Sequence, residues 1–413
     1  MLSIIIKTLI KNCLLSLNIR CFAREVIKNL KKTAILSLTS LVVLCASVGQ
    51  ILFSFASLTP ARTIAASGII IENAVKSIRK LLVAYGISSP LSQNFIMHMA
   101  KFDLIDTDFR IGPDVEKIKA INPGIIILGY NDVMGRSPNS EDWSEVDQHE
   151  DWFVHDVDGN RLQNKHWGWY CMDVGNQGWR EHYANYVREK IDLYGFDGVF
   201  ADDVWSHLFK DAWTVPLEKV PDYPDWHHKM IEFLRHVKSR VGSKLLIVNT
   251  PNNSDYVDVA DGKMEEHFAF KSFSSQTPID NIDALFQISG RDKYYLASPH
   301  NMPEDTEKNM LYALCCFLLG VNGPNAYFSW RNVWSEPSHG YRPEFDVSLG
   351  SPANEYYLIG SVYARDFEKG KVLVNPTRSS YTFSLEENYK TLGGQVVSNV
   401  TLAANTAIIL LRV

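Results

Sequence analysis

Short runs of β-branched and aromatic residues alternate with amphipathic stretches from about Leu81 onward. This alternation is typical of a parallel sheet whose strands are joined by crossover helices. The predicted strands are Leu82–Ile87, Phe102–Thr107, Ile125–Tyr130, Asp197–Asp203, Leu245–Thr250, Gly262–Phe268, Lys293–Ser298 and Ala326–Trp330. Eight strands within about 250 residues match the usual size of a (β/α)8 barrel, or TIM barrel, so we predict this fold in the α/β class.

The segments between these strands contain helical patterns. Helices are predicted at Asp114–Asn122, Gly178–Tyr194, Trp226–Val241 and Thr306–Leu319. One long segment, from Asn131 to Asn176, lacks this periodicity and is rich in Trp, Asp, His and Gly. Loops of that length inside compact domains are usually functional or disordered, and the aromatic content favours a folded lid or a substrate platform.

The last part of the chain has a different pattern. After Tyr357, short alternating stretches are separated by Asn-Pro, Gly-Gly and Asn turns. Such stretches are typical of antiparallel strands, so we predict a small C-terminal β-sandwich at residues 358–413. The barrel itself is expected to span residues 81–357.

Near the amino terminus, basic residues precede a long uncharged run. Lys31 and Lys32 stand directly before the run Thr33–Pro60, which has aliphatic residues throughout. This order predicts an N-terminal hydrophobic segment within residues 1–80, either a membrane-spanning signal anchor or a cleaved signal peptide. Both alternatives place the rest of the chain outside the cytoplasm, either anchored to the membrane or secreted.

Composition narrows the function further. The formal charge of −6 and the pI near 6.1 argue against nucleic-acid binding, which needs a basic face. The six cysteines show no zinc-site spacing, so we predict neither a metal nor a cofactor. The 10 Trp, 18 Tyr and 20 Phe suit a carbohydrate partner, because sugar rings stack on aromatic rings, although aromatic side chains also fill large cores.

Two predicted strands end in paired carboxylates, Asp202–Asp203 and Glu265–Glu266. Catalytic residues of (β/α)8 barrels come from the carboxyl ends of the strands. Glycoside hydrolysis needs two such groups, one acting on the anomeric carbon and one giving a proton to the leaving oxygen. Neighbouring side chains on a strand point to opposite faces, so only one member of each pair can face the barrel mouth. Strand parity alone does not say which member that is.

Three segments carry a family resemblance: Tyr170–Arg180, Tyr194–Asp203 (YGFDGVFADD) and Ala260–Phe268 (ADGKMEEHF). They are similar to hypothetical glycosyl hydrolase family 15 and, more distantly, to α-galactosidase-like and polygalactosaminidase-like barrels. This resemblance implies that Asp202 and Glu266 are the matched acids. By similarity to the α-galactosidase/α-glucosidase clan, it further implies that Asp202 is the nucleophile and Glu266 the proton donor.

Other residues have positions suited to binding a sugar substrate: Tyr85, Asp173, Asp203, Asn249, Trp330 and Arg331. Polar groups at these positions also tie barrel loops together. Asp173 could instead cap the helix that begins near Asn176.

The sequence therefore predicts a glycoside hydrolase that acts on an extracellular oligo- or polysaccharide through an Asp/Glu pair. The alternative is a non-catalytic carbohydrate-binding barrel. A metal-dependent hydrolase using the four strand-end acids is disfavoured, since no His is clearly spaced to complete its site.

Overall fold

The computed structural model describes residues 77–250, 255–269, 278–299, 306–330 and 340–413. The hydrophobic run predicted to be a membrane or signal segment lies outside these residues. Within the described ranges, no helix combines the length and apolar character needed to cross a membrane. The domain boundaries proposed from the sequence stay predictions.

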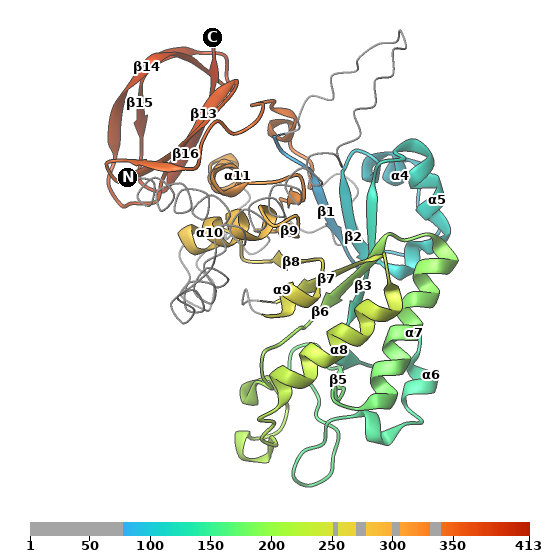
Figure 1. Ribbon diagram of the computed structural model, residues 1–413. Coiled ribbons are helices and arrows are strands. Elements are labelled where there is room, and N and C mark those ends of the chain that lie inside the picture. Colours follow the sequence, from blue (N-terminus) through green and yellow to red (C-terminus); the bar gives the residue numbers. More distant parts are fainter. Residues whose placement is uncertain (1–76, 251–254, 270–277, 300–305, 331–339) are drawn as a thin grey trace, which may run out of the picture. The chain divides into compact units, whose positions relative to one another are not determined.

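Eight parallel strands form the barrel (Figure 1). In sheet order they are β1 (Leu81–Ala84), β2 (Leu104–Asp108), β3 (Ile126–Asp132), β6 (Gly198–Asp202), β7 (Leu245–Asn249), β8 (Gly262–Glu265), β9 (Tyr294–Ala297) and β10 (Ala326–Phe328). The ring closes where Lys80 forms a parallel bridge with Phe328, whose amide donates to the Arg79 carbonyl at 2.9 Å. The predicted (β/α)8 barrel is confirmed, because every predicted strand overlaps an observed one.

Alternate residues of the strands fill the barrel interior. The interior cluster consists of Leu81, Val83, Leu104, Leu128, Phe200, Ile247, Met264, Leu296 and Tyr327. The apolar residues between them on the same strands pack outward, in the clusters shared with the helices. This two-residue period also determines which side chain at each carboxyl end continues into the barrel mouth.

Helices lie between the strands along the chain. They are α4 (Gln93–Met99), α5 (Gly112–Ile121), α7 (Gln177–Tyr194), α8 (Trp226–Val241), α9 (Asp255–Val259), α10 (Pro278–Ser289) and α11 (Glu307–Gly320). The predictions for α5, α7, α8 and α11 are confirmed, whereas α4, α9 and α10 were not predicted. Helix α7 begins at an Asn176 cap, whose side chain accepts from the Trp179 amide at 3.1 Å, and ends at a left-handed Gly195.

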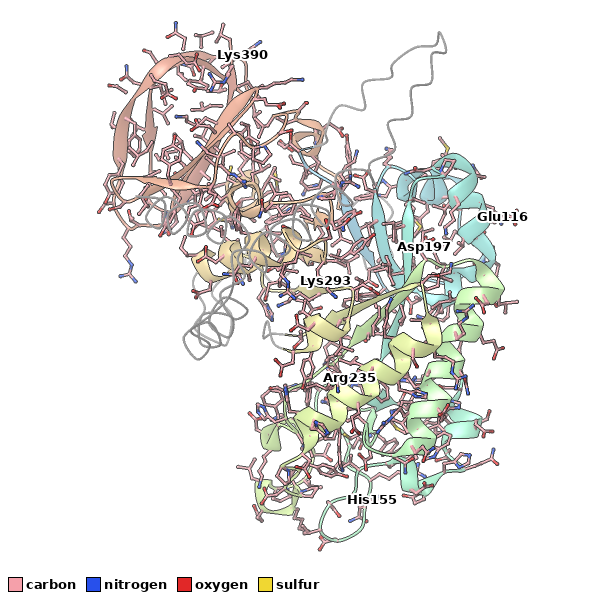
Figure 2. The ribbon with its side chains drawn as sticks, in the orientation of Figure 1. Glu116, His155, Asp197, Arg235, Lys293 and Lys390 are labelled. Carbon is pink, nitrogen blue, oxygen red and sulfur yellow. The ribbon has the colours of Figure 1, made fainter. Side chains whose placement is uncertain are left out.

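Carboxylates bind the amino ends of neighbouring strands together. In three places, the side chain of an Asp that directly precedes a strand accepts a hydrogen bond from a backbone N–H in or just before the neighbouring strand. The three pairs, each at 2.8 Å, are Asp103 with the Lys80 amide, Asp197 with the Ile127 amide and Asp261 with the Leu246 amide. Asp197 therefore lies at the amino-terminal end of the barrel strands, where it contributes to the stability of the fold. Figure 2 shows it far from His155, which lies in the excursion that follows β3.

The long segment between β3 and α7 is folded. It contains β4 (Gly135–Arg136), α6 (Trp143–Val146) and β5 (Tyr170–Cys171). Further backbone hydrogen bonds extend it into a meander, with Leu162 donating to Val154 at 2.8 Å and Cys171 donating to Leu162 at 2.9 Å. The expectation of a folded excursion is confirmed, and its role as a lid or platform stays a prediction.

The C-terminal strands form one continuous antiparallel sheet. They are β11 (Tyr357–Ile359), β12 (Val362–Phe367), β13 (Gly370–Asn375), β14 (Tyr381–Thr391), β15 (Val396–Leu402) and β16 (Thr406–Arg412), in the order β11-β12-β13-β16-β14-β15. The sheet curls, so that β12–β13 and β14–β15 share one apolar cluster in the manner of a sandwich (Figure 1). The predicted antiparallel C-terminal region is confirmed.

A buried arginine joins this sheet to the barrel helices. Arg365 of β12 is 2% exposed and donates to the carbonyls of Leu318, Leu319 and Val321 at 3.0, 2.8 and 2.6 Å. These carbonyls belong to the end of α11, where the helix leaves its last acceptors unpaired. The guanidinium therefore hydrogen-bonds the last carbonyls of α11, and its positive charge interacts favourably with the negative end of the helix dipole.

Substitution of Gly198 tests whether β6 must approach β7 closely. A Cβ there would lie 2.2 Å from the Leu245 carbonyl oxygen, which is backbone and cannot turn aside. We expect Gly198→Ala to destabilise the fold by about 1–3 kcal/mol, measured by denaturant unfolding. The control Gly393→Ala, where the nearest atom is 3.8 Å away, should change the stability little. Equal effects of the two variants would contradict this packing.

Candidate active site

Asp202 stands at the carboxyl end of β6, in phase with the interior residue Phe200. Its carboxylate accepts three hydrogen bonds, from Tyr130 Oη at 2.7 Å, Asn249 Nδ2 at 2.7 Å and the Asp203 amide at 2.8 Å. All three partners donate, an arrangement that suits an ionised carboxylate. Asp202 is therefore the member of its pair that faces the mouth.

Glu266 follows β8 in phase with the interior Met264. Loss of hydration and the charge of Asp202 raise its pKa to about 8, against the lowering effect of a hydrogen bond from Asn249. Glu265 points to the opposite face, where it pairs with Lys263 at 3.0 Å, and both of these residues are buried. The structure thus shows that Glu266, and not Glu265, continues the inward phase of β8 toward the barrel mouth, a choice that strand parity alone did not settle.

Asp106 and Tyr85 lie in the same mouth. Tyr85 Oη donates to Asp106 Oδ2, and the Tyr85 ring lies 4.8 Å from the ring of Tyr130. Asp106 is fully buried, and this loss of hydration raises its pKa well above the ordinary value, with the charges of Asp202 and Glu266 adding to the rise. The predicted residue Tyr85 is therefore part of the carboxyl cluster.

The cluster draws on consecutive strands of the barrel. Tyr85, Asp106, Asp132, Asp202, Asn249 and Glu266 each continue the inward phase of β1, β2, β3, β6, β7 and β8 in turn. Asp132 and Asp202 are register partners on β3 and β6. Six neighbouring strands thus place polar side chains around one opening. Within the described ranges, no three ligand-type side chains have a metal-binding arrangement.

Other predicted site residues have different surroundings. Both carboxylate oxygens of Asp173 are engaged, since one accepts from the Gly175 amide and the other from Tyr223 Oη, at 2.8 Å each. Asp173 does not cap α7, because Asn176 does. Trp330 shares the outward phase of Phe328 and is fully buried in the apolar cluster outside the barrel, so the structure does not bring it to the mouth. Arg331 lies outside the described residues.

Asp203 is half-buried beside Asp202, but its side chain has other partners. Its Oδ1 accepts from Trp205 Nε1 at 2.9 Å, and its carboxyl lies within hydrogen-bonding reach of Asp132. Tyr130 and Trp205 are site residues that the sequence reasoning did not select. The available signal for Tyr130 was its position two residues before Asp132 on a strand. Trp205 offered only its place two residues after an acidic strand end.

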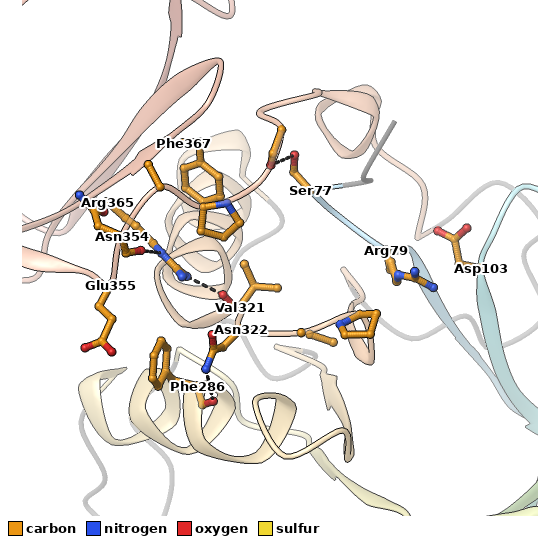
Figure 3. A pocket seen from close by; sticks show the side chains of 16 residues that line it. Ser77, Arg79, Asp103, Phe286, Val321, Asn322, Asn354, Glu355, Arg365 and Phe367 are labelled. Atoms are coloured by element: carbon orange, nitrogen blue, oxygen red, sulfur yellow. Dashed lines mark hydrogen bonds between the residues drawn. The ribbon is translucent and has the colours of Figure 1, made fainter. Parts of the chain in front are cut away.

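A separate cavity of about 1010 Å³ lies at the other end of the barrel (Figure 3). Its lining includes Arg79 and Asp103, which precede β1 and β2, together with Arg365 of the C-terminal sheet. Active sites of this fold form at the carboxyl ends of the strands. The cavity therefore belongs to the packing of sheet against barrel and not to the candidate site.

The fold and the acid-lined mouth are those of a glycosidase-type barrel. A model of hypothetical glycosyl hydrolase family 15 matches residues 119–371, more than half of the chain, so the chain belongs to this family. A search of curated proteins gave no match.

Similar solved structures include a noncanonic maltogenic alpha-amylase, AmyB, from Thermotoga neapolitana, with a TM-score of 0.51, 13% identity and coverage of 82% of this chain and 99% of that one. An alpha-amylase from Malbranchea cinnamomea has a TM-score of 0.48 and 11% identity, over 82% of this chain and 96% of that one. The glycoside hydrolase domain of PelA from Pseudomonas aeruginosa has a TM-score of 0.42 and 16% identity, over 66% and 97%. At 13% identity, the likeness to AmyB shows a shared fold.

The raised pKa of Glu266 predicts a pH-dependent stability difference. Between its ordinary value of 4.5 and about 8, the folded protein retains a proton that the unfolded chain releases. Parent stability should therefore fall with rising pH across this window relative to Glu266→Gln, and the gap should level off above it. Thermal unfolding across a pH series measures the gap.

The exposed Glu218→Gln serves as the control, and its unfolding temperature should follow that of the parent at every pH. A gap between the parent and Glu266→Gln that stays constant from acid to alkaline pH would show that Glu266 is not held in its protonated form.

Proposed function

We propose that this chain is a glycoside hydrolase that cleaves an oligo- or polysaccharide with Asp202 and Glu266. The observation that carries this proposal is the unequal environment of the two carboxyls. Asp202 is surrounded by three donors, whereas Glu266, lying beside that charge, has its pKa raised to about 8. Two acids with opposed protonation states are what acid–base glycosidic cleavage requires.

In the proposed reaction, a carboxylate oxygen of Asp202 attacks the anomeric carbon. The bond between that carbon and the leaving oxygen breaks, and the leaving oxygen takes the proton of Glu266. The resulting glycosyl ester is hydrolysed by a water molecule whose proton returns to Glu266. Tyr130 and Asn249, which both donate to Asp202, hold the attacking carboxylate in position.

Aromatic side chains beside the acids support a sugar substrate. Trp205 lies two residues after Asp203, and its ring centroid lies 6.2 Å from that of Trp169, 6.1 Å from that of Trp213 and 5.0 Å from that of Phe209. Trp169 and Trp213 are buried and support Trp205 and Phe209, which are half-buried and present the faces on which a sugar ring would stack through its C–H groups. The hydrophobic N-terminal run supports an extracytoplasmic location, and hence an extracellular glycan as substrate.

Substitution of either acid tests the reaction. We expect Asp202→Asn to abolish turnover, with a loss of about 10⁴-fold or more. Glu266→Gln should lower kcat by about 10²–10⁴-fold on natural glycans, and by less on aryl glycosides whose leaving group needs no proton. Reducing-sugar release from a panel of polysaccharides, followed by kinetics on the best substrate, measures both effects.

Glu218→Gln is the matched control for these assays and should behave as the parent does. Unchanged turnover in both acid variants would contradict the assigned pair. If the parent binds a glycan but releases no sugar from any panel member, the chain is the alternative, a carbohydrate-binding barrel.

The pH dependence of turnover follows from the same acid. Glu266 must be protonated to act, so kcat/KM should fall above about pH 8, by about tenfold per pH unit. In Glu266→Gln, the residual activity should lack this alkaline decline. A parent profile that stays flat to pH values well above 8 would assign the proton donor to another group.

A further inference from the structure

Asp203 has a backbone conformation that few non-glycine residues adopt. Its φ is +54°, in the left-handed region, which persists only where the surroundings favour it. In this conformation, its amide donates to Asp202 Oδ1 at 2.8 Å and its carbonyl accepts from the Trp205 amide at 2.8 Å. The turn at Asp203 therefore orients both the proposed nucleophile and the following tryptophan.

The Asp203 carboxyl is shared with a second acid. It lies within hydrogen-bonding reach of the Asp132 carboxyl, and two carboxyls can share a hydrogen bond only when one of them carries a proton. Asp132 Oδ1 already accepts from the Met134 and Gly135 amides at 2.8 Å each, which favours negative charge on Asp132. The shared proton therefore belongs to Asp203.

The surrounding charges favour keeping this proton. Asp132 and Asp202 are register partners, and Asp203 is next to Asp202 in the chain, so without this proton three neighbouring carboxylates would all be charged. Loss of hydration raises the pKa of Asp203 well above its ordinary value, and the charges of Asp132 and Asp202 add to the rise. The pKa of Asp132 is raised to about 6 by loss of hydration and the charge of Asp202, although its backbone hydrogen bond and the Arg136 charge oppose this.

We propose that Asp203 is a positioning residue: a protonated carboxyl that donates to Asp132 while its amide holds Asp202 and its Oδ1 holds Trp205. This inference rests on the proposed function and deepens it. It gives the second aspartate of the pair a role other than binding sugar. It also explains how three adjacent acids coexist at the mouth with a single attacking carboxylate.

Trp205 connects the turn at Asp203 to the group of aromatic rings beside the acids. Its carbonyl accepts from Trp226 Nε1 and Tyr256 Oη at 3.2 Å each, so its main chain is fixed on the side away from Asp203. The Asp203 bond to Trp205 Nε1 then fixes the indole ring itself. One residue thus holds both groups: the Asp203 carboxyl holds a proposed sugar-stacking ring, and the Asp203 amide holds the proposed nucleophile.

Two substitutions at Asp203 test whether its carboxyl acts in the protonated form. Asp203→Asn supplies an N–H toward Asp132 and an oxygen for Trp205, and Asn tolerates the left-handed region. Asp203→Gly keeps the backbone conformation but removes all side-chain bonds. We expect Gly to lower kcat by about 10²-fold, because Trp205 and Asp132 lose the side-chain bonds that hold them beside Asp202, and Asn to recover most of that loss. Equal loss in both variants would overturn the proposal.

Infrared spectroscopy tests the proton without any turnover. At neutral pH, the difference spectrum between the parent and Asp203→Asn should contain the C=O stretch of a protonated carboxyl. The same difference taken with Glu218→Gln should not contain it. Absence of the band overturns the shared proton. If the parent cleaves no glycan, the proposed function fails, but this spectrum still decides the protonation of Asp203.

Discussion

The alternation of side chains along closed, parallel strands is the constraint on which this site depends. In a barrel, one face of every strand looks into a packed interior and the other against the helices, so a residue's phase decides its environment. Phe200 and Met264 fill the interior, and this places Asp202 and Glu266 in the mouth. Glu265, one residue before Glu266, pairs with Lys263 on the opposite face. Asp203, one residue beyond the end of β6, takes a left-handed conformation and comes close to Asp132.

The same alternation creates an electrostatic problem at the mouth. Asp106, Asp132, Asp202 and Glu266 all continue an inward phase, so carboxyls crowd a region poor in water. The cluster avoids full ionisation by holding protons. Burial and mutual repulsion raise the pKa values of Asp106, Asp203 and Glu266, while hydrogen-bond donors gather on Asp202 and on Asp132. Negative charge is thereby left on Asp202, the proposed nucleophile, and on Asp132.

Much of this architecture was predictable, because turn signals and apolar runs locate strands and helices locally. The phase of each strand was not, because a strand buried on both faces is apolar throughout. Val199, Phe200 and Ala201 gave no sign of which face was interior. The left-handed turn at Asp203 depends on tertiary partners more than on local propensity. Trp330 looked suitable for sugar stacking at a strand end, yet its outward phase buries it.

Arg365 bears on how such chains evolve. Its guanidinium donates to three main-chain carbonyls at the end of α11 and to the Asn354 carbonyl, so the barrel and the C-terminal sheet are joined through atoms present in every amino acid. Side-chain drift in α11 would leave this attachment intact, whereas loss of the single cation would leave buried carbonyls unpaired. A C-terminal sheet that lacked this arginine would therefore leave the end of α11 unsatisfied if it replaced the present one.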